Sequence, residues 1–141
     1  MNMRLHERFE RIIAAARTGV SILTLLLPGA VWAEGAVRLL DCSVARVCDA
    51  AGTCEAGAMQ VIFRMAPEET GVDGAGSYAL SYGDTQADME ALSDAGPFFW
   101  TVGTERNTLL ASSETQMLWH QLTFDPVPES TIRFLTCALR Q

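Results

Sequence analysis

The four cysteines are the residues whose types and spacing suggest chemistry most directly. Cys42, Cys48 and Cys54 stand at two equal six-residue steps in the stretch DCSVARVCDAAGTC, and Cys137 lies near the end of the chain. Such a set can hold a zinc ion, form a redox-active pair or form disulfides. Zinc sites use spacings such as C-x2-C or a pair of histidines, and redox pairs use C-x-x-C; the segment after residue 33 contains neither. We therefore predict disulfides, with no metal and no cofactor.

Four cysteines allow three pairings, and the spacing favours one of them. Five residues that include Gly52 separate Cys48 from Cys54, which suits a hairpin loop closed by a local bridge. This leaves Cys42 to pair with Cys137. On the chain-entropy model the local bridge contributes about 2.4 kcal/mol and the long-range bridge about 4.7 kcal/mol. The long-range bridge is therefore expected to matter more for stability.

His120 is the single histidine after residue 33, so it is the candidate for hydrolytic catalysis. A hydrolase would need it beside an activated Ser or Cys, but no G-x-S-x-G stretch occurs and the cysteines are predicted to be oxidised. His120 lies two residues from both Leu118 and Leu122, so the three share one face of a strand. We predict a packed, hydrogen-bonded core histidine and no enzyme activity. A small hydrolase that uses His120 is the alternative.

Two groups of residues are candidates for binding a ligand. The stretch APEETGVDGAG, residues 66–76, is predicted to be a long acidic loop between two strands, and loops on a rigid β scaffold often carry recognition. Its carboxylates, Glu68, Glu69 and Asp73, lack the D-x-D-x-D-G spacing of a calcium site. We treat them as weak candidates for ligand contacts.

The aromatic residues of GPFFW and LWHQL form the second group. Phe98 and Trp100 must lie on the strand face opposite to Phe99, because successive side chains alternate. An exposed Phe99 or Trp119 would be a contact anchor for a partner. Core packing is expected for most of these rings.

The N-terminal segment predicts export. Four arginines precede the apolar run VSILTLLL, which ends at Pro28-Gly29, and Val31-Trp32-Ala33 resembles a cleavage site. The 14 residues from Val20 to Ala33 are too few for an uncleaved anchor, since a spanning helix needs about 20 continuous apolar residues. We predict a signal peptide over residues 1–33 and a periplasmic or extracellular product without membrane insertion.

The charge of the remaining chain excludes one class of partner. Residues 34–141 keep six arginines against fifteen acidic residues, a net charge of −9, and the sequence contains no lysine. Nucleic acids and anionic lipids are bound through clusters of Lys and Arg, so nucleic-acid binding is excluded. The same acidity would steer a basic partner protein toward this chain.

The hydrophobic pattern has a period of two, which predicts antiparallel strands. In MQVIFRM, Met59, Val61, Phe63 and Met65 share one face. Seven strands are predicted, over residues 37–46, 59–65, 77–82, 98–103, 108–112, 117–124 and 131–139. The connections between them contain Gly, Pro, Asp, Asn and Ser, among them Glu105-Arg106-Asn107. We predict one all-β domain over residues 34–141.

The segment TQADMEALSD, residues 85–94, fits either a strand or a short helix. Ala87, Met89 and Ala91 alternate with acidic residues, which favours a strand, whereas Ala, Met, Glu and Leu are good helix formers. A strand here gives eight short strands and an antiparallel barrel or sandwich. A helix would make the fold α+β.

A closed barrel would bring two of the cysteines together. The first and last strands of such a barrel are neighbours, and Cys42 and Cys137 lie on these two strands, in phase with Leu40 and Leu135. Their disulfide would pin the closing seam. Most of the predicted strands have only five to nine residues, which favours a solid core over a large ligand cavity.

A small disulfide-closed barrel of this size resembles, in architecture, exported lysozyme-inhibitor domains, which insert a loop into a glycosidase cleft. The sequence match to their Ser/Gly/Tyr loop is limited to GAGSY, residues 74–78, and assigns no residue roles. The sequence thus predicts a non-catalytic binding module of the cell envelope with a protein or glycan ligand. A structural or accessory subunit of an envelope assembly is the alternative.

Overall fold

The computed structural model describes residues 35–140, and the predicted signal peptide, residues 1–33, lies outside this range. Every regular element in the described range is a β-strand, and the range contains no helix. The strands are β1 (Arg38–Asp49), β2 (Cys54–Ala56), β3 (Gln60–Thr70), β4 (Gly76–Tyr82), β5 (Thr85–Ala91), β6 (Phe98–Val102), β7 (Glu105–Ala111), β8 (Gln116–Phe124) and β9 (Pro128–Arg140).

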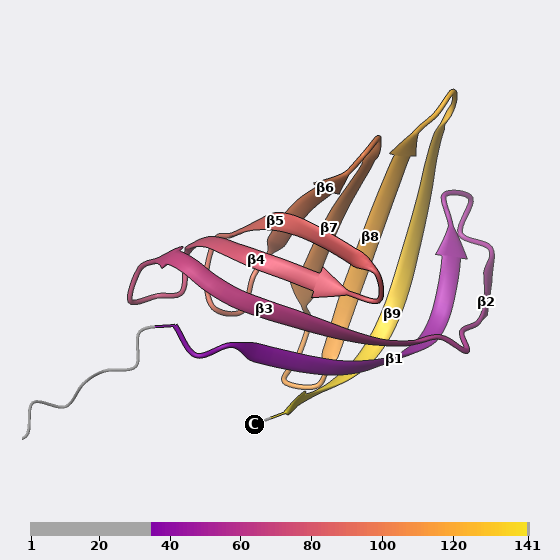
Figure 1. Cartoon of the computed structure of the whole chain (residues 1–141). Helices are drawn as coiled ribbons and strands as arrows, with labels where there is room; N and C mark the ends of the chain where they lie inside the picture. The colour runs from indigo at the N-terminus through magenta and orange to yellow at the C-terminus, as the bar shows by residue number, and fades with distance from the viewer. Residues whose placement is uncertain (1–34, 141) are drawn as a thin grey trace, which may run out of the picture. The chain divides into compact units, whose positions relative to one another are not determined.

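Eight of these strands close into an antiparallel barrel. The order is β1-β3-β4-β5-β6-β7-β8-β9, and β9 pairs back onto β1 to complete the circle. The short strand β2 is an addition that pairs with the end of β1 and forms a hairpin with it (Figure 1). The prediction of a small all-β barrel of about seven to eight strands is confirmed, and β2 is present in addition to the eight barrel strands.

Alternation of side chains builds the core. Buried residues recur at every second position, as in Val61, Phe63 and Met65 of β3, while the residues between them face solvent. Large side chains fill the barrel, among them Tyr78, Phe63, Phe98, Met65, Met89, Leu109 and Leu135, each at most 2% exposed. The apolar face of the barrel strands is thus largely removed from water, which is the main favourable term in folding.

Aromatic rings form the centre of this core. Phe63, Tyr82, Trp100 and Trp119 contact one another in every pairing, with ring centroids 5.3–6.2 Å apart. All six pairs are tilted or edge-to-face, and edge-to-face contacts are among the arrangements that aromatic quadrupoles favour. The interior of the barrel is thus occupied by side chains at this level.

Both predicted disulfides are present and join residues that face each other in adjacent strands. Cys42 of β1 pairs with Cys137 of β9 at the closing seam, across 95 positions of sequence. Cys48 and Cys54 close the β1–β2 hairpin. Two disulfides are compatible with an oxidising, exported compartment.

In the ambiguous segment 85–94, residues 85–91 form the strand β5. β5 pairs with β4 over seven residues, and Met89 and Ala91 are buried at a period of two. The helical alternative is wrong because pairing and burial in the barrel outweigh the helix propensity of Ala, Met and Glu.

Several predicted connections are also strand, so the strands are longer than expected. β9 has 13 residues, β1 has 12 and β3 has 11. Glu105, Arg106 and Asn107 open β7 and pair with both β6 and β8, while the turn before them is Gly103-Thr104. Met59, predicted to lie in a strand, precedes β3 and is 42% exposed. Residues 105–107 were predicted to be a turn because they are polar, but they form a strand because β6 and β8 pair with them.

Candidate functional site

The junction between β5 and β6 is the least paired junction of the barrel. Only three residue pairs join these strands, from Met89–Trp100 to Ala91–Phe98. By contrast, β5 pairs with β4 over seven residues and β6 with β7 over five. Figure 1 shows β4 and β5 lying across the view while β6 to β9 rise steeply. The two strands therefore part beyond Met89 and Trp100.

A shallow groove of about 560 Å³ lies on the outer side of this junction. It is lined by residues of β5, β6 and β7: Asp88, Glu90, Phe99, Trp100, Thr101, Arg106, Asn107 and Thr108. We call it the β5–β7 groove. Its volume is in the range of sites that hold small ligands or a few side chains of a partner.

Phe99 is the apolar contact point of the β5–β7 groove. It is 39% exposed and faces outward, directly opposite Glu90 in the β5–β6 pairing. Phe98 and Trp100 on either side of it are buried in the core, which fixes the strand that carries Phe99. An exposed ring on a rigid strand can contact a partner with little loss of conformational entropy.

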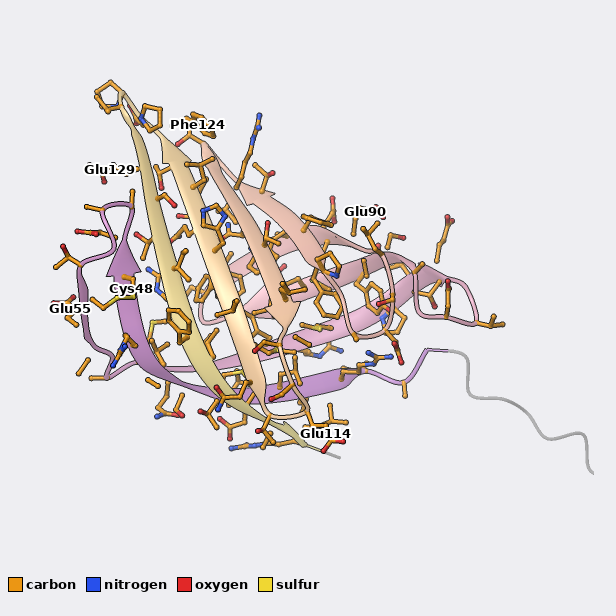
Figure 2. The ribbon with its side chains drawn as sticks, turned by 180° about the vertical axis from the view of Figure 1, so that it is seen from behind. Cys48, Glu55, Glu90, Glu114, Phe124 and Glu129 are labelled. Atoms are coloured by element: carbon orange, nitrogen blue, oxygen red, sulfur yellow. A yellow bond between two sulfur atoms is a disulfide. The ribbon has the colours of Figure 1, made fainter. Side chains whose placement is uncertain are left out.

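Charged side chains stand on both sides of Phe99. Asp88 and Glu90 project outward from β5, and Figure 2 labels Glu90 on the outer side of the barrel. On the other side, the guanidinium of Arg106 lies 5.2 Å from the centroid of the Phe124 ring, a cation–π contact. The arginine is therefore partly engaged within the protein, while the two carboxylates face the groove.

A polar network inside the barrel lies behind the β5–β7 groove. Asn107, only 2% exposed, accepts a hydrogen bond from Trp119 Nε1 at 2.8 Å and donates one to Glu105 Oε1 at 2.9 Å. Trp100 Nε1 donates to the hydroxyl of Tyr82 at 3.2 Å. Satisfied polar groups of this kind fix ring orientations, because each alternative leaves a buried donor without a partner.

Arg133 is the charged member of this interior network. Its guanidinium lies 4.7 Å from the centroid of the Trp119 ring and donates to Gln121 Oε1 at 2.6 Å. Burial lowers the pKa of Arg133, and the nearby Glu105 and Tyr82 act in the opposite direction. Sequence analysis missed Asn107, Gln121 and Arg133. The signal that could have found them is their phase with the buried Leu109, Trp119 and Leu135.

His120 lies outside the barrel core, contrary to prediction. It does share a strand face with Leu118 and Leu122, but this face is the outer one, because Trp119 takes the inward position. His120 is half-buried and its Nε2 lies 2.8 Å from Ser130 Oγ, which joins β8 to β9. The four cysteines are all in disulfides, so none is a reduced partner for it.

The acidic segment 66–76 is mostly strand. β3 continues to Thr70 and pairs with β4, so Glu68 and Glu69 lie on a strand, and only residues 71–75 form a turn. Pro67 is tolerated because β1 pairs with β3 only as far as Met65 and the register shifts just after Pro67. The expectation of a long loop was wrong because the hairpin pairing extends past the proline.

The turn at residues 71–75 is held to the rest of the protein. Asp73 Oδ1 accepts a hydrogen bond from Ala75 N, and its carbonyl accepts one from Asp94 N in the β5–β6 connection. Gly74 has a φ of 74°, and a Cβ there would lie 2.6 Å from the Cβ of Asp94. The glycine therefore permits close contact between the two turns.

The five candidate contact residues of the sequence are not brought together. Glu68, Glu69 and Asp73 belong to the β3–β4 hairpin, Phe99 lies in the β5–β7 groove, and Trp119 is 4% exposed within the core. Phe99 is the one aromatic candidate that a partner can reach. Trp119 instead orients the interior network.

Within residues 35–140, no three His, Cys, Asp or Glu side chains gather in a way that could hold a metal ion. A search of the same residues for a helix long and apolar enough to span a membrane finds none. No protein-family model, curated protein or solved structure matches this chain. The function is therefore argued from the geometry of the groove.

Proposed function

We propose that the chain, after removal of residues 1–33, is an exported binding module without catalytic activity that holds a protein or glycan ligand of the cell envelope. The observation that carries this proposal is Phe99, an exposed ring between acidic and basic side chains in a groove on a disulfide-closed barrel. Rigid presentation of an aromatic anchor is what a recognition surface requires. The signal-peptide pattern and the two disulfides support export.

The test compares Phe99 with an exposed side chain outside the groove. Leu110 is 41% exposed on the outer face of β7 and does not line the β5–β7 groove, so Leu110→Ala is the matched control for Phe99→Ala. Oxidised protein covering residues 34–141 is immobilised and exposed to envelope extract and, separately, to purified cell-wall glycan. We expect one component to be retained by the wild type and by Leu110→Ala and lost with Phe99→Ala.

The variants must be folded for this comparison to be valid. Near-UV circular dichroism of the tryptophans reports on the core in each protein. Equal retention by all three proteins, or retention of nothing at low salt, would contradict the proposal.

A further inference from the structure

The parted strands at the β5–β6 junction leave two short backbone edges. Thr85 to Asp88 of β5 pair with β4 but not with β6, and Thr101 and Val102 of β6 pair with β7 but not with β5, among the residues that the structure describes. Strand residues direct their N–H and C=O groups alternately to the two sides. Each edge therefore presents backbone donors and acceptors toward the opening, although a closed barrel usually has no such edge.

Val102, the last residue of β6, is also exposed beside this opening. It is in phase with Phe98 and Trp100, which are 1% and 4% exposed, yet Val102 is 36% exposed. Its strand neighbour on the β7 side, Glu105, is present. On the other side, no residue of β5 pairs with Val102.

The charges around the opening favour a basic occupant. Asp84 lies in the β4–β5 turn, and Asp88 and Glu90 project outward from β5. Arg64 and Arg106 line pockets together with Asp88, but neither forms an ion pair with it. The sole ion pair in the described range joins Arg140 to Asp41 on the β1–β9 seam. The chain has a formal net charge of −7, which adds a long-range attraction for a cationic segment.

A second copy of this chain is a poor occupant of the same edge. Antiparallel pairing of β5 with β5 of another copy, centred on Gln86, would place Asp84 of each copy opposite Asp88 of the other. Like charges on directly opposing strands destabilise the pairing. The edge therefore favours a different protein over self-association.

We propose that the edge of β5 from Thr85 to Asp88 binds an extended, basic segment of a partner protein as an additional β-strand. Backbone hydrogen bonds to the edge supply affinity, as in other cases of β-strand addition. Outward Lys or Arg side chains of the added strand lie beside Asp88, and an inward apolar side chain covers Val102. The inference rests on the proposed binding function and narrows its ligand to a protein.

The test uses synthetic hexapeptides with the folded, oxidised chain. The probe is acetyl-Lys-Val-Lys-Val-Lys-Val-amide, and its charge control carries Glu at each Lys position. Two further peptides carry N-methyl groups on alternate residues, one on the Lys and one on the Val positions. Binding is followed by tryptophan fluorescence and by amide hydrogen exchange resolved for residues 85–88.

We expect the Lys peptide to bind at least about tenfold more tightly than the Glu peptide and to slow exchange at the β5 amides that face β6. One N-methylated peptide should lose binding and the other should keep it, because alternate N–H groups face opposite sides of a strand. A merely electrostatic contact would treat both N-methylated peptides alike and would overturn the inference.

Variants of the chain locate the site. Asp88→Asn should weaken binding of the Lys peptide by about threefold to tenfold, while Glu114→Gln should not change it. Glu114 is an exposed carboxylate in the β7–β8 turn, and Figure 2 shows it well separated from Glu90. Equal losses in the two variants would overturn the proposed location.

Two other results would also overturn the inference. One is hydrogen-exchange protection of residues 85–88 that increases with protein concentration in the absence of peptide. The edge would then be occupied by a second copy of the chain. The other is failure of the Lys peptide while Phe99-dependent retention of an envelope component persists, which leaves the binding function intact and removes strand addition. Loss of both activities would contradict both proposals.

Discussion

β1 and β9 pair over ten residue positions and are joined by Cys42–Cys137, whereas β5 and β6 pair over three positions and have no covalent tie. The β1–β9 junction closes the barrel, whereas the β5–β6 junction joins two strands that are consecutive in the sequence, and the numbers of paired residues differ greatly. The β1–β9 seam joins the first and last strands of the described range, so it must overcome the largest loop-closure entropy. The β5–β6 junction follows a short connection and can remain partly open at low cost.

The β1–β9 seam stabilises the barrel, whereas the β5–β6 junction is the region that we propose to bind a partner. A long ladder and a disulfide fix the seam, and the solid aromatic core supports the strands from within. At the junction, the same core leaves Val102 and Phe99 exposed and two edges without a neighbour. Elements that bind partners are often drawn from the less stable parts of a fold.

The largest expected contrast is in amide hydrogen exchange of the unmodified protein. Seam amides within Leu40–Val44 that are bonded between strands should exchange only on global unfolding, whereas β5 amides that face β6 should exchange in the folded state. With a typical stability above about 5 kcal/mol, the rates should differ by at least about a thousandfold. Exchange measured by NMR at residue resolution checks this, and similar protection at the two junctions would contradict the comparison.

Removal of the seam disulfide should be the most destabilising change. The double variant Cys42→Ala, Cys137→Ala should lose about 4.7 kcal/mol of unfolding free energy, since the bridge closes a loop of nearly the whole domain. Alanine avoids placing a hydroxyl in a buried site. Urea unfolding without reductant measures the loss, and a change below about 1 kcal/mol would show that the strand ladder alone closes the barrel.

The hairpin disulfide provides a matched comparison within the same strand. Cys48→Ala with Cys54→Ala should cost about 2.4 kcal/mol, because the unfolded loop that it closes is short. The same urea experiment applies. If this pair proved the more stabilising, loop length would not be the controlling factor.

Asn107→Ala should destabilise the side of the barrel behind the groove by about 1–3 kcal/mol, because Trp119 Nε1 would be left without its acceptor in the core. The tryptophan near-UV signal should change with it. Glu105→Gln is the control, since a glutamine oxygen still accepts from Asn107. If Glu105→Gln lost as much stability as Asn107→Ala, the effect would come from the charge of Glu105 and not from the hydrogen bond to Trp119.

The smallest effect is expected for the ion pair on the seam. The side chains of Arg140 and Asp41 are 57% and 28% exposed, so Arg140→Ala should change stability by about 0–1 kcal/mol, and less at high salt. Urea unfolding at low and high ionic strength provides the measurement. A larger loss would mean that electrostatics, and not only pairing and the disulfide, hold the seam.

Much of the fold could be predicted because it depends on local signals. Alternation in residues 59–65 and 77–82 indicated strands with a buried face, and cysteine spacing indicated both disulfides. Strand boundaries were less predictable, since the polar residues Glu105 and Asn107 resemble a turn until their neighbours pair with them. β2 was missed because three exposed residues carry no periodic pattern.

The candidate site was less predictable than the fold. Alternation established that Phe99 opposes Phe98 and Trp100, but not which face was the interior. For His120 and Trp119 the faces were assigned the wrong way round, because both alternating sets around them contain large apolar residues. Such a strand has an ambiguous inner face until its cross-strand partners are known.

By itself, the sequence determined the composition of the two faces of most strands and the acidic charge, because these depend on residue type and short spacings, and it favoured one of the three possible cysteine pairings. Only the tertiary structure decided that β5 and β6 part after three residue pairs and leave Phe99 and Val102 beside an open edge. Pairing between strands depends on how the whole barrel closes, and no local pattern encodes where a ladder ends.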